Sequence, residues 1–165
     1  MKYEIERKFL IEYPDEAALR TRSARVADIV QTYLERTEKD VSRRVRQSTE
    51  NGAVTYTKNE KRRISSMKRE ESESEITRPE YDELLMTADP TRHPIIKTRY
   101  CVPIGPLTAE IDVFRGITEF AVCEVELPDE NAAFTLPDFV SVIREVTGDP
   151  RFTNSAMAKN RVSGC

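Results

Sequence analysis

The chain has 165 residues, of which 38% are hydrophobic and 33% are charged, and its formal net charge is −3 at pH 7. This length suits one domain over residues 1–165 with a sizeable buried core. The slightly negative charge argues against the broad basic surface of a nucleic-acid-binding protein, and no apolar run is long enough to predict a membrane-spanning helix.

Alternation of charged and apolar residues predicts β-strands through most of the chain, because side chains two positions apart in a strand point to the same side. The predicted strands cover residues 2–12, 26–37, 41–49, 53–62, 68–76, 95–104, 108–115 and 120–127. Between the third and fourth, Asn51-Gly52 favours the positive φ angles of a type I′ hairpin turn. Short turns of this kind make the predicted sheet mostly antiparallel.

Three helices are predicted beside these strands. The first covers residues 14–23. The second begins at Thr77, which can form a capping box with Glu80, and it ends before Pro90. The third is predicted to begin at Pro137, because apolar residues recur after it at helical spacing: Phe139, Val140, Ile143 and Val146.

Charged side chains recur at every second position in most of the predicted strands. The basic members are Lys8, Arg44, Arg46, Lys58, Arg69, Lys97 and Arg99. The acidic members are Glu4, Glu6, Glu73, Glu75, Glu110, Asp112, Glu124 and Glu126. This spacing is typical of solvated strand faces joined by cross-strand ion pairs, and also of a closed sheet whose charged face is the inside.

A closed sheet with both signs of charge inside would suit a polyanion that arrives with a divalent metal, such as triphosphate with Mg²⁺. Carboxylate oxygens bind hard cations, arginine presents a rigid fork to phosphate oxygens, and lysine presents a compact charge. The spacing alone leaves open whether these side chains line such a lumen or face water.

The order of the motifs resembles the CYTH superfamily, also called triphosphate tunnel metalloenzymes. Glu4, Glu6 and Lys8 match the family's ExExK signature at the N-terminus. Further matches follow in the family's order at residues 31–34, 44–46, 56–58, 69–75, 97–100, 110–112, 124–127 and 148–155. The resemblance covers almost the whole chain, and it implies an α+β fold in which an eight-stranded antiparallel β-barrel forms a tunnel with a few flanking helices.

The resemblance also implies roles for the charged residues. The carboxylates implied to hold divalent metal are Glu4, Glu6, Glu124 and Glu126. The side chains implied to bind phosphate are Lys8, Arg44, Arg46, Lys58, Arg69, Lys97 and Arg99. Glu4, Glu6 and Lys8 would form the catalytic set. A further acidic group is expected to ligate metal, to orient the basic residues, or both: Glu73, Glu75, Glu110 and Asp112.

By this resemblance we expect a triphosphatase, dependent on Mg²⁺ or Mn²⁺, that hydrolyses inorganic tripolyphosphate to diphosphate and phosphate. The chain has no tryptophan and no evident site for a base or a thiazole ring, which favours a small inorganic substrate. The alternatives are a thiamine or nucleoside triphosphatase, a class IV-type adenylyl cyclase, and a non-catalytic polyphosphate-binding protein.

The cysteines and the N-terminus indicate the cellular compartment in which the protein is expected. Cys101, Cys123 and Cys165 show no metal-binding spacing, and the N-terminus lacks the apolar centre of a signal peptide. We therefore expect free thiols in the cytoplasm, with no nucleic-acid or membrane partner. The sequence leaves the oligomeric state open between monomer and homodimer.

Overall fold

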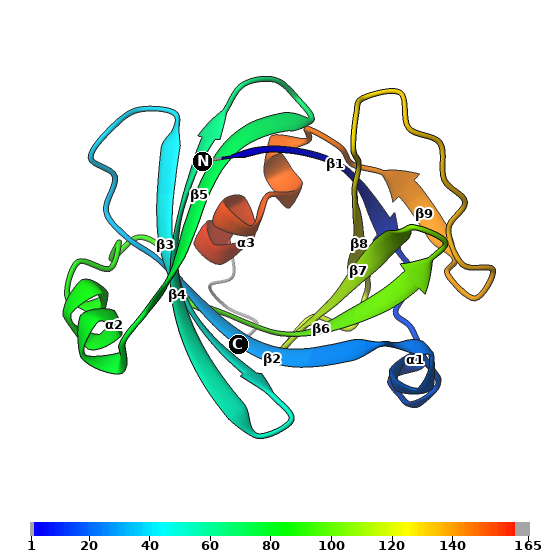
Figure 1. Cartoon of the computed structure of the whole chain (residues 1–165), viewed down its shortest axis with the longest axis horizontal. Helices are drawn as coiled ribbons and strands as arrows, with labels where there is room; N and C mark the ends of the chain where they lie inside the picture. Colours follow the sequence, from blue (N-terminus) through cyan, green and yellow to red (C-terminus); the bar gives the residue numbers. More distant parts are fainter. Residues whose placement is uncertain (1, 161–165) are drawn as a thin grey trace.

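A computed structural model describes residues 2–160, in which strands wind into a closed antiparallel barrel (Figure 1). The strands are β1 (Lys2–Ile11), β2 (Arg25–Tyr33), β3 (Val41–Glu50), β4 (Ala53–Arg63), β5 (Lys68–Ile76), β6 (Ile95–Ile104), β7 (Leu107–Phe114), β8 (Ala121–Glu126) and β9 (Val142–Glu145). The helices are α1 (Glu16–Arg22), α2 (Arg78–Leu85), the short 3-10 helix η1 (Pro150–Phe152) and α3 (Asn154–Asn160). None of these helices is long and apolar enough to cross a membrane.

β1 closes the barrel. The strand order is β5-β4-β3-β2-β6-β7-β8-β1, and β1 also pairs with β5. Residues 2–5 of β1 pair with β5, while residues 6–11 pair with β8. β1 therefore joins the two ends of the sheet, and the expected eight-stranded antiparallel barrel is confirmed.

Local sequence signals account for several elements. Asn51 and Gly52 have φ angles of 51° and 79°, which confirms the predicted hairpin turn between β3 and β4. The capping box predicted at the start of α2 is also present, since Thr77 and Glu80 each bond the other's backbone N–H.

The helix predicted to begin at Pro137 is wrong, because residues 142–145 form the short strand β9. Where β5 leaves β1, the backbone of Phe9, Leu10 and Ile11 would have an unpaired edge, and β9 fills it. The backbone pairing continues beyond β9, where Val146 N–H donates to the Lys8 carbonyl at 2.8 Å. The hydrogen bonds that β1 offers to residues 142–145 thus outweigh the helical preference that the spacing of apolar residues indicated.

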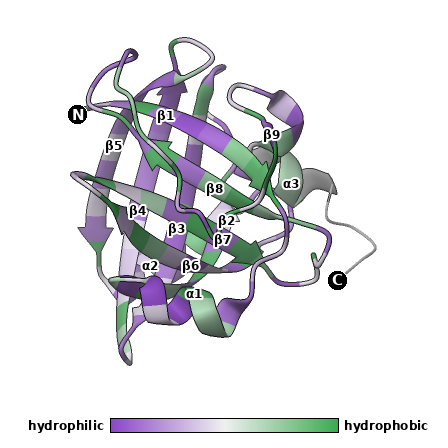
Figure 2. Ribbon diagram, turned by 90° about the vertical axis from the view of Figure 1, so that its right-hand side faces the viewer, coloured by the Kyte–Doolittle hydropathy of each residue, from purple (hydrophilic) through white to green (hydrophobic). Residues whose placement is uncertain are grey.

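Apolar residues occupy the outer face of the barrel and one end of its interior. The outer clusters lie beneath α1, α2 and residues 132–140. Inside, Leu10, Tyr33 and Phe114 pack with Met157 and Ala158 of α3. Figure 1 shows α3 within the outline of the barrel, and Figure 2 shows hydrophobic and hydrophilic residues within the same strands. The charged part of the interior therefore lies next to an apolar plug.

Candidate active site

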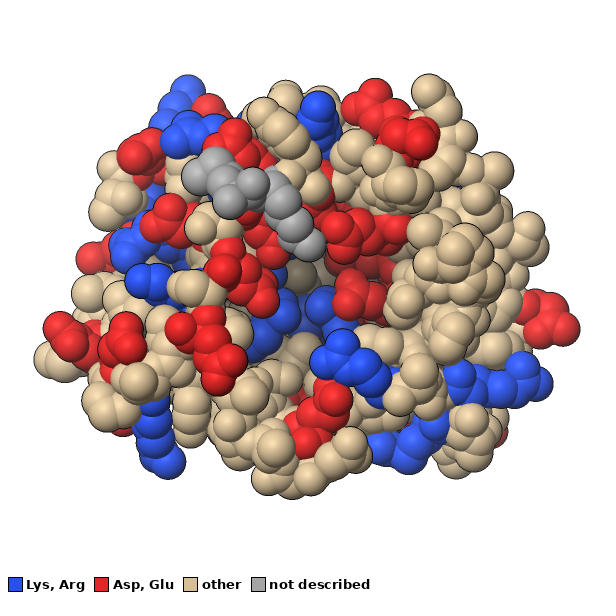
Figure 3. Space-filling view, in the orientation of Figure 1, with Lys and Arg blue, Asp and Glu red and all other residues tan. Residues whose placement is uncertain are grey.

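The strand registers place the charged motifs on one shared inner face. Glu4 lies opposite Arg69 across the β1–β5 pair, and Lys8 lies opposite Glu124 across the β1–β8 pair. Glu124 in turn lies opposite Glu110 of β7. Because residues opposite each other point to the same side of a sheet, these side chains meet in the lumen. Figure 3 shows side chains of both charges inside the hollow of the barrel.

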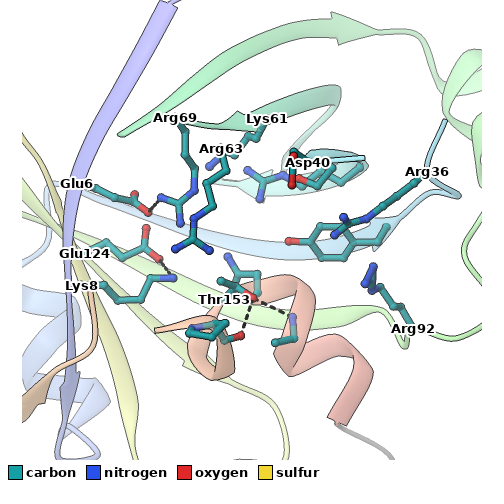
Figure 4. Close-up of a pocket in the computed structure, with 16 residues that line it drawn as sticks. Glu6, Lys8, Arg36, Asp40, Lys61, Arg63, Arg69, Arg92, Glu124 and Thr153 are labelled. Carbon is teal, nitrogen blue, oxygen red and sulfur yellow. Dashed lines mark hydrogen bonds and ion pairs between the residues drawn. The ribbon is translucent and has the colours of Figure 1, made fainter. Parts of the chain in front are cut away.

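A cavity of about 370 Å³ opens among these side chains (Figure 4). Its basic lining residues are Lys8, Arg36, Arg44, Lys61, Arg63, Arg69 and Arg92. Its acidic lining residues are Glu6, Asp40 and Glu124. Cations outnumber carboxylates around the cavity, so its field attracts a compact polyanion.

Three buried glutamates form a cluster at one side of the lumen: Glu4, Glu6 and Glu124. Each is matched by a basic side chain. Glu4 Oε1 lies 3.1 Å from Lys61 Nζ, and Glu6 Oε1 accepts a hydrogen bond of 2.9 Å from Arg69. Lys8 Nζ lies 3.3 Å from Glu124 Oε1, and it donates to the Phe152 carbonyl of η1 at 3.1 Å.

The three glutamates of the cluster differ in how readily they ionise. Burial, and then the charge of Glu124, raises the pKa of Glu6 to about 9. Burial also opposes the ionisation of Glu4 and Glu124. The charge of Lys61 nevertheless lowers the pKa of Glu4, and the charge of Lys8 lowers that of Glu124.

The adjoining strands β6 and β7 carry a second ionic network, centred on Asp112. Asp112 accepts a hydrogen bond of 2.7 Å from Lys97 Nζ and one of 2.8 Å from Arg99 Nε. Burial disfavours the charge of Asp112, but Arg99 and Lys97 outweigh it and hold its pKa well below the usual range. Glu110 adds a longer contact of 3.5 Å to Arg99. Asp112 thus fixes two of the expected phosphate-binding cations in place.

Arg44 and Arg46 form no ion pair with any residue that the structure describes, unlike Lys8, Lys61, Arg69, Lys97 and Arg99. Arg44 Nε is buried without a hydrogen-bond partner. Arg46 donates to Gln31 Oε1 at 2.8 Å, and burial together with Arg44 and Arg99 lowers its pKa. An anion bound beside these two arginines would relieve their mutual repulsion.

Comparison with known proteins places this geometry in a family. Residues 2–151 match the family model of the CYTH domain. The chain belongs to the CYTH domain family. The match covers the strands that carry the glutamate cluster and both arginines, so the resemblance seen in the sequence motifs is confirmed.

Individual relatives agree with this assignment. An inorganic triphosphatase from Acetivibrio thermocellus is 41% identical over 125 residues, which are 74% of this chain and 75% of that protein. The crystal structure of the inorganic triphosphatase NE1496 is 28% identical, with 96% of each chain covered and a TM-score of 0.59. The PH1819 protein from Pyrococcus horikoshii OT3 shares the fold, with a TM-score of 0.62 at 20% identity over 78% of this chain and 80% of that one.

The position of Lys58 corrects one expectation taken from the CYTH motifs. Lys58 is exposed on the outer face, because it lies opposite Val45, which packs beneath α2. Asn59 is the inward neighbour, and its amide donates to Glu71 at 2.9 Å and to Glu73 at 3.1 Å. The predicted turn contained the signal for this. A two-residue loop pairs Glu50 with Ala53 and thereby Arg44 with Asn59.

The remaining expected residues are on the inner face but differ in environment. Glu73 and Glu75 face the lumen on β5 and are exposed, as is Glu126, which lies opposite Glu6. The sequence motifs missed four basic residues that line the cavity: Lys61, Arg63, Arg36 and Arg92. Lys61 and Arg63 follow Asn59 at the alternating spacing that continues the inner face of β4.

The glutamate cluster suits a magnesium-type ion that also contacts its substrate. Within residues 2–160, no three acidic, histidine or cysteine side chains are arranged to hold one ion together. Magnesium in phosphate-processing sites usually takes one or two carboxylates and completes its shell with water and phosphate oxygens. Such a shared site would need one or two of the carboxylates of Glu4, Glu6 and Glu124.

Proposed function

We propose that the protein is a metal-dependent triphosphatase that hydrolyses inorganic tripolyphosphate to diphosphate and phosphate. One observation carries the proposal: two arginines without counter-charges, Arg44 and Arg46, share a lumen with three buried glutamates. A passive polyphosphate binder would gain little from the glutamates. The activity of the Acetivibrio thermocellus relative, which is 41% identical, supports the same reading.

The roles of the residues follow from their partners. Arg44 and Arg46 would grip phosphate oxygens directly, because they have no carboxylate to release first. Lys97 and Arg99 are held by Asp112, so they offer their remaining donors from a fixed position. Holding an extended triphosphate in one orientation and neutralising its charge is most of what phosphoryl transfer to water requires of a protein.

Glu4, Glu6 and Glu124 would hold Mg²⁺ or Mn²⁺ together with phosphate oxygens. A divalent ion bound there supplies charge neutralisation and lowers the pKa of a coordinated water. Glu126 lies opposite Glu6 at the more exposed end of the cluster and is proposed as a further ligand.

The direct test is phosphate release from a panel of triphosphates with Mg²⁺ or Mn²⁺, with excess EDTA as the metal-free arm. Tripolyphosphate is expected to be the best substrate, and Glu124→Gln is expected to lose most turnover while the protein still folds. Undiminished hydrolysis in EDTA would refute the metal dependence. If ATP gave cyclic AMP as the main product, the proposed activity would be that of an adenylyl cyclase and not of a triphosphatase.

We also propose a cytoplasmic protein whose partner is a small triphosphate. Cys101 and Cys123 are free thiols, as expected in a reducing compartment. The cationic side chains that could attract phosphate are gathered in the lumen, which admits a linear anion more readily than a nucleic-acid duplex.

A further inference from the structure

Lys61 lies between the glutamate cluster and the arginines. On β4 it faces the lumen, opposite Ser42 of β3 and Glu71 of β5. Its ammonium group donates to Glu4 Oε1 at 3.1 Å, and Figure 4 shows it at the rim of the cavity near Arg69. Lys61 is therefore paired with a carboxylate that the proposed function assigns to the metal.

Lys61 reaches the cavity from its pair with Glu4. The side chains of Lys61 and Glu4 keep 19% and 10% of their surface exposed, whereas those of Lys97 and Asp112 keep 0% and 2%. The buried Lys97 side chain is held against Asp112. Lys61 lines the cavity, so its ammonium can leave Glu4 without entering an apolar environment.

A second partner is within reach. Arg44 lies opposite Asn59 and Ser42 lies opposite Lys61, so Arg44 and Lys61 are diagonal neighbours on one face. The Cα atoms of such neighbours are about 7–8 Å apart. A phosphate group held by Arg44 would therefore lie within the span of the flexible four-carbon side chain of lysine.

A divalent ion on the Glu4 carboxylate would repel the ammonium beside it. We propose that Lys61 changes partners, neutralising Glu4 in the metal-free protein and turning to the phosphate chain beside Arg44 once Glu4 binds a divalent ion. This inference rests on the proposed triphosphatase function. Its consequence is reciprocal, since metal and triphosphate then strengthen each other's binding.

The test compares Lys61→Met with the wild-type protein in two binding measurements. Binding of Mn²⁺ alone, followed by paramagnetic resonance, is expected to become about tenfold tighter, because the competing ammonium is gone. Binding of imidotriphosphate with Mn²⁺ present, followed by calorimetry, is expected to become about tenfold weaker. Without metal, the affinity for imidotriphosphate is expected to change by less than about twofold, since Lys61 then stays on Glu4.

Two controls separate an exchange of partners by Lys61 from a general change in the electrostatic potential of the lumen. Lys58→Met removes the same charge from the outer face of the same strand and should leave both affinities unchanged. The double variant Lys61→Met with Glu4→Gln should bind Mn²⁺ no more tightly than Glu4→Gln alone, because the competition needs both partners. Lys61→Gln is a second variant with the same expected shifts, should the methionine protein fold poorly.

Shifts of opposite sign for the two ligands support the exchange. Weaker imidotriphosphate binding to the same degree with and without metal would make Lys61 a permanent phosphate contact and overturn the exchange. Tighter Mn²⁺ binding with unchanged imidotriphosphate binding would make it a structural neutraliser and also overturn it. A wild-type protein that binds both ligands but does not hydrolyse tripolyphosphate would refute the proposed function alone, so the two failures are distinguishable.

Discussion

Asp112 lies opposite Arg99 across the β6–β7 pair and accepts two hydrogen bonds from its guanidinium group, of 2.8 Å from Nε and 2.9 Å from Nη2. The same carboxylate accepts the hydrogen bond from Lys97. One buried acid therefore sets the positions of two cations in the lumen.

Asp112→Asn is expected to destabilise the protein by about 3 kcal/mol, because Lys97 and Arg99 lose their buried counter-charge. The KM for tripolyphosphate should rise as well, since neither cation is then held in place. Chemical denaturation and steady-state kinetics measure the two effects. The matched control is Glu110→Gln. The Glu110 side chain is 37% exposed and lies 3.5 Å from Arg99, so this ion pair should contribute less than about 1 kcal/mol to the free energy of unfolding. Equal stability of the two variants would contradict the proposed role of Asp112.

Lys58→Ala should leave the KM for tripolyphosphate within about twofold of wild type, because this side chain lies on the outer face. Arg44→Ala should raise the KM by at least about tenfold, because it removes a cation that has no other partner. The KM values of both purified variants, measured at saturating metal, test these two expectations. A large rise in KM for Lys58→Ala would show that β4 presents its other face to the substrate.

The metal-free protein should lose stability as the pH rises from about 5 to 9. Burial and Glu124 raise the pKa of Glu6 to about 9, so the folded state holds this proton more tightly than the unfolded chain does. That stabilising contribution is complete below the unfolded value near 4.5 and disappears as the pH passes through about 9. Melting curves in EDTA across this range give the slope. Glu6→Gln cannot titrate and should show a shallower slope, and identical slopes would place the proton elsewhere.

Gly148→Ala should cost about 2 kcal/mol through two separate strains. Gly148 has a φ of +73°, and an added Cβ would lie 2.7 Å from Ser66 Cβ in the β4–β5 hairpin. Gly105→Ala is the matched control, since its φ of +63° carries the backbone strain while no atom lies within 4 Å of the new Cβ. The difference between the two melting temperatures therefore measures the contact with Ser66. No difference would mean that the hairpin moves aside freely.

The sequence predicted the barrel well because its strands are hairpin neighbours with charges at period two. It placed Glu4, Glu6, Lys8 and Glu124 correctly on one face, since their strand pairings follow that period. It misplaced Lys58, because a motif was read by residue type without counting the register from the turn at Asn51-Gly52.

Other features depend on contacts that local patterns do not contain. β9 forms because β1 has an open edge where β5 departs, which becomes visible only when the sheet is closed. The apolar plug depends on Met157 and Ala158 meeting residues from five strands. Lys61 was overlooked because its partner, Glu4, lies 57 positions away in the sequence.

The residues that β1 contributes to the site are synthesised before nearly all the others. The ammonium group of Lys8 is hydrogen bonded to a carbonyl 144 positions later in the chain. At a synthesis rate of about 5–20 residues per second, Lys8 is added to the chain roughly 7 to 29 s before Phe152, whose carbonyl is that partner. A nascent or prematurely terminated chain therefore has carboxylates and cations but no lumen, and only the completed polypeptide can capture its polyanion.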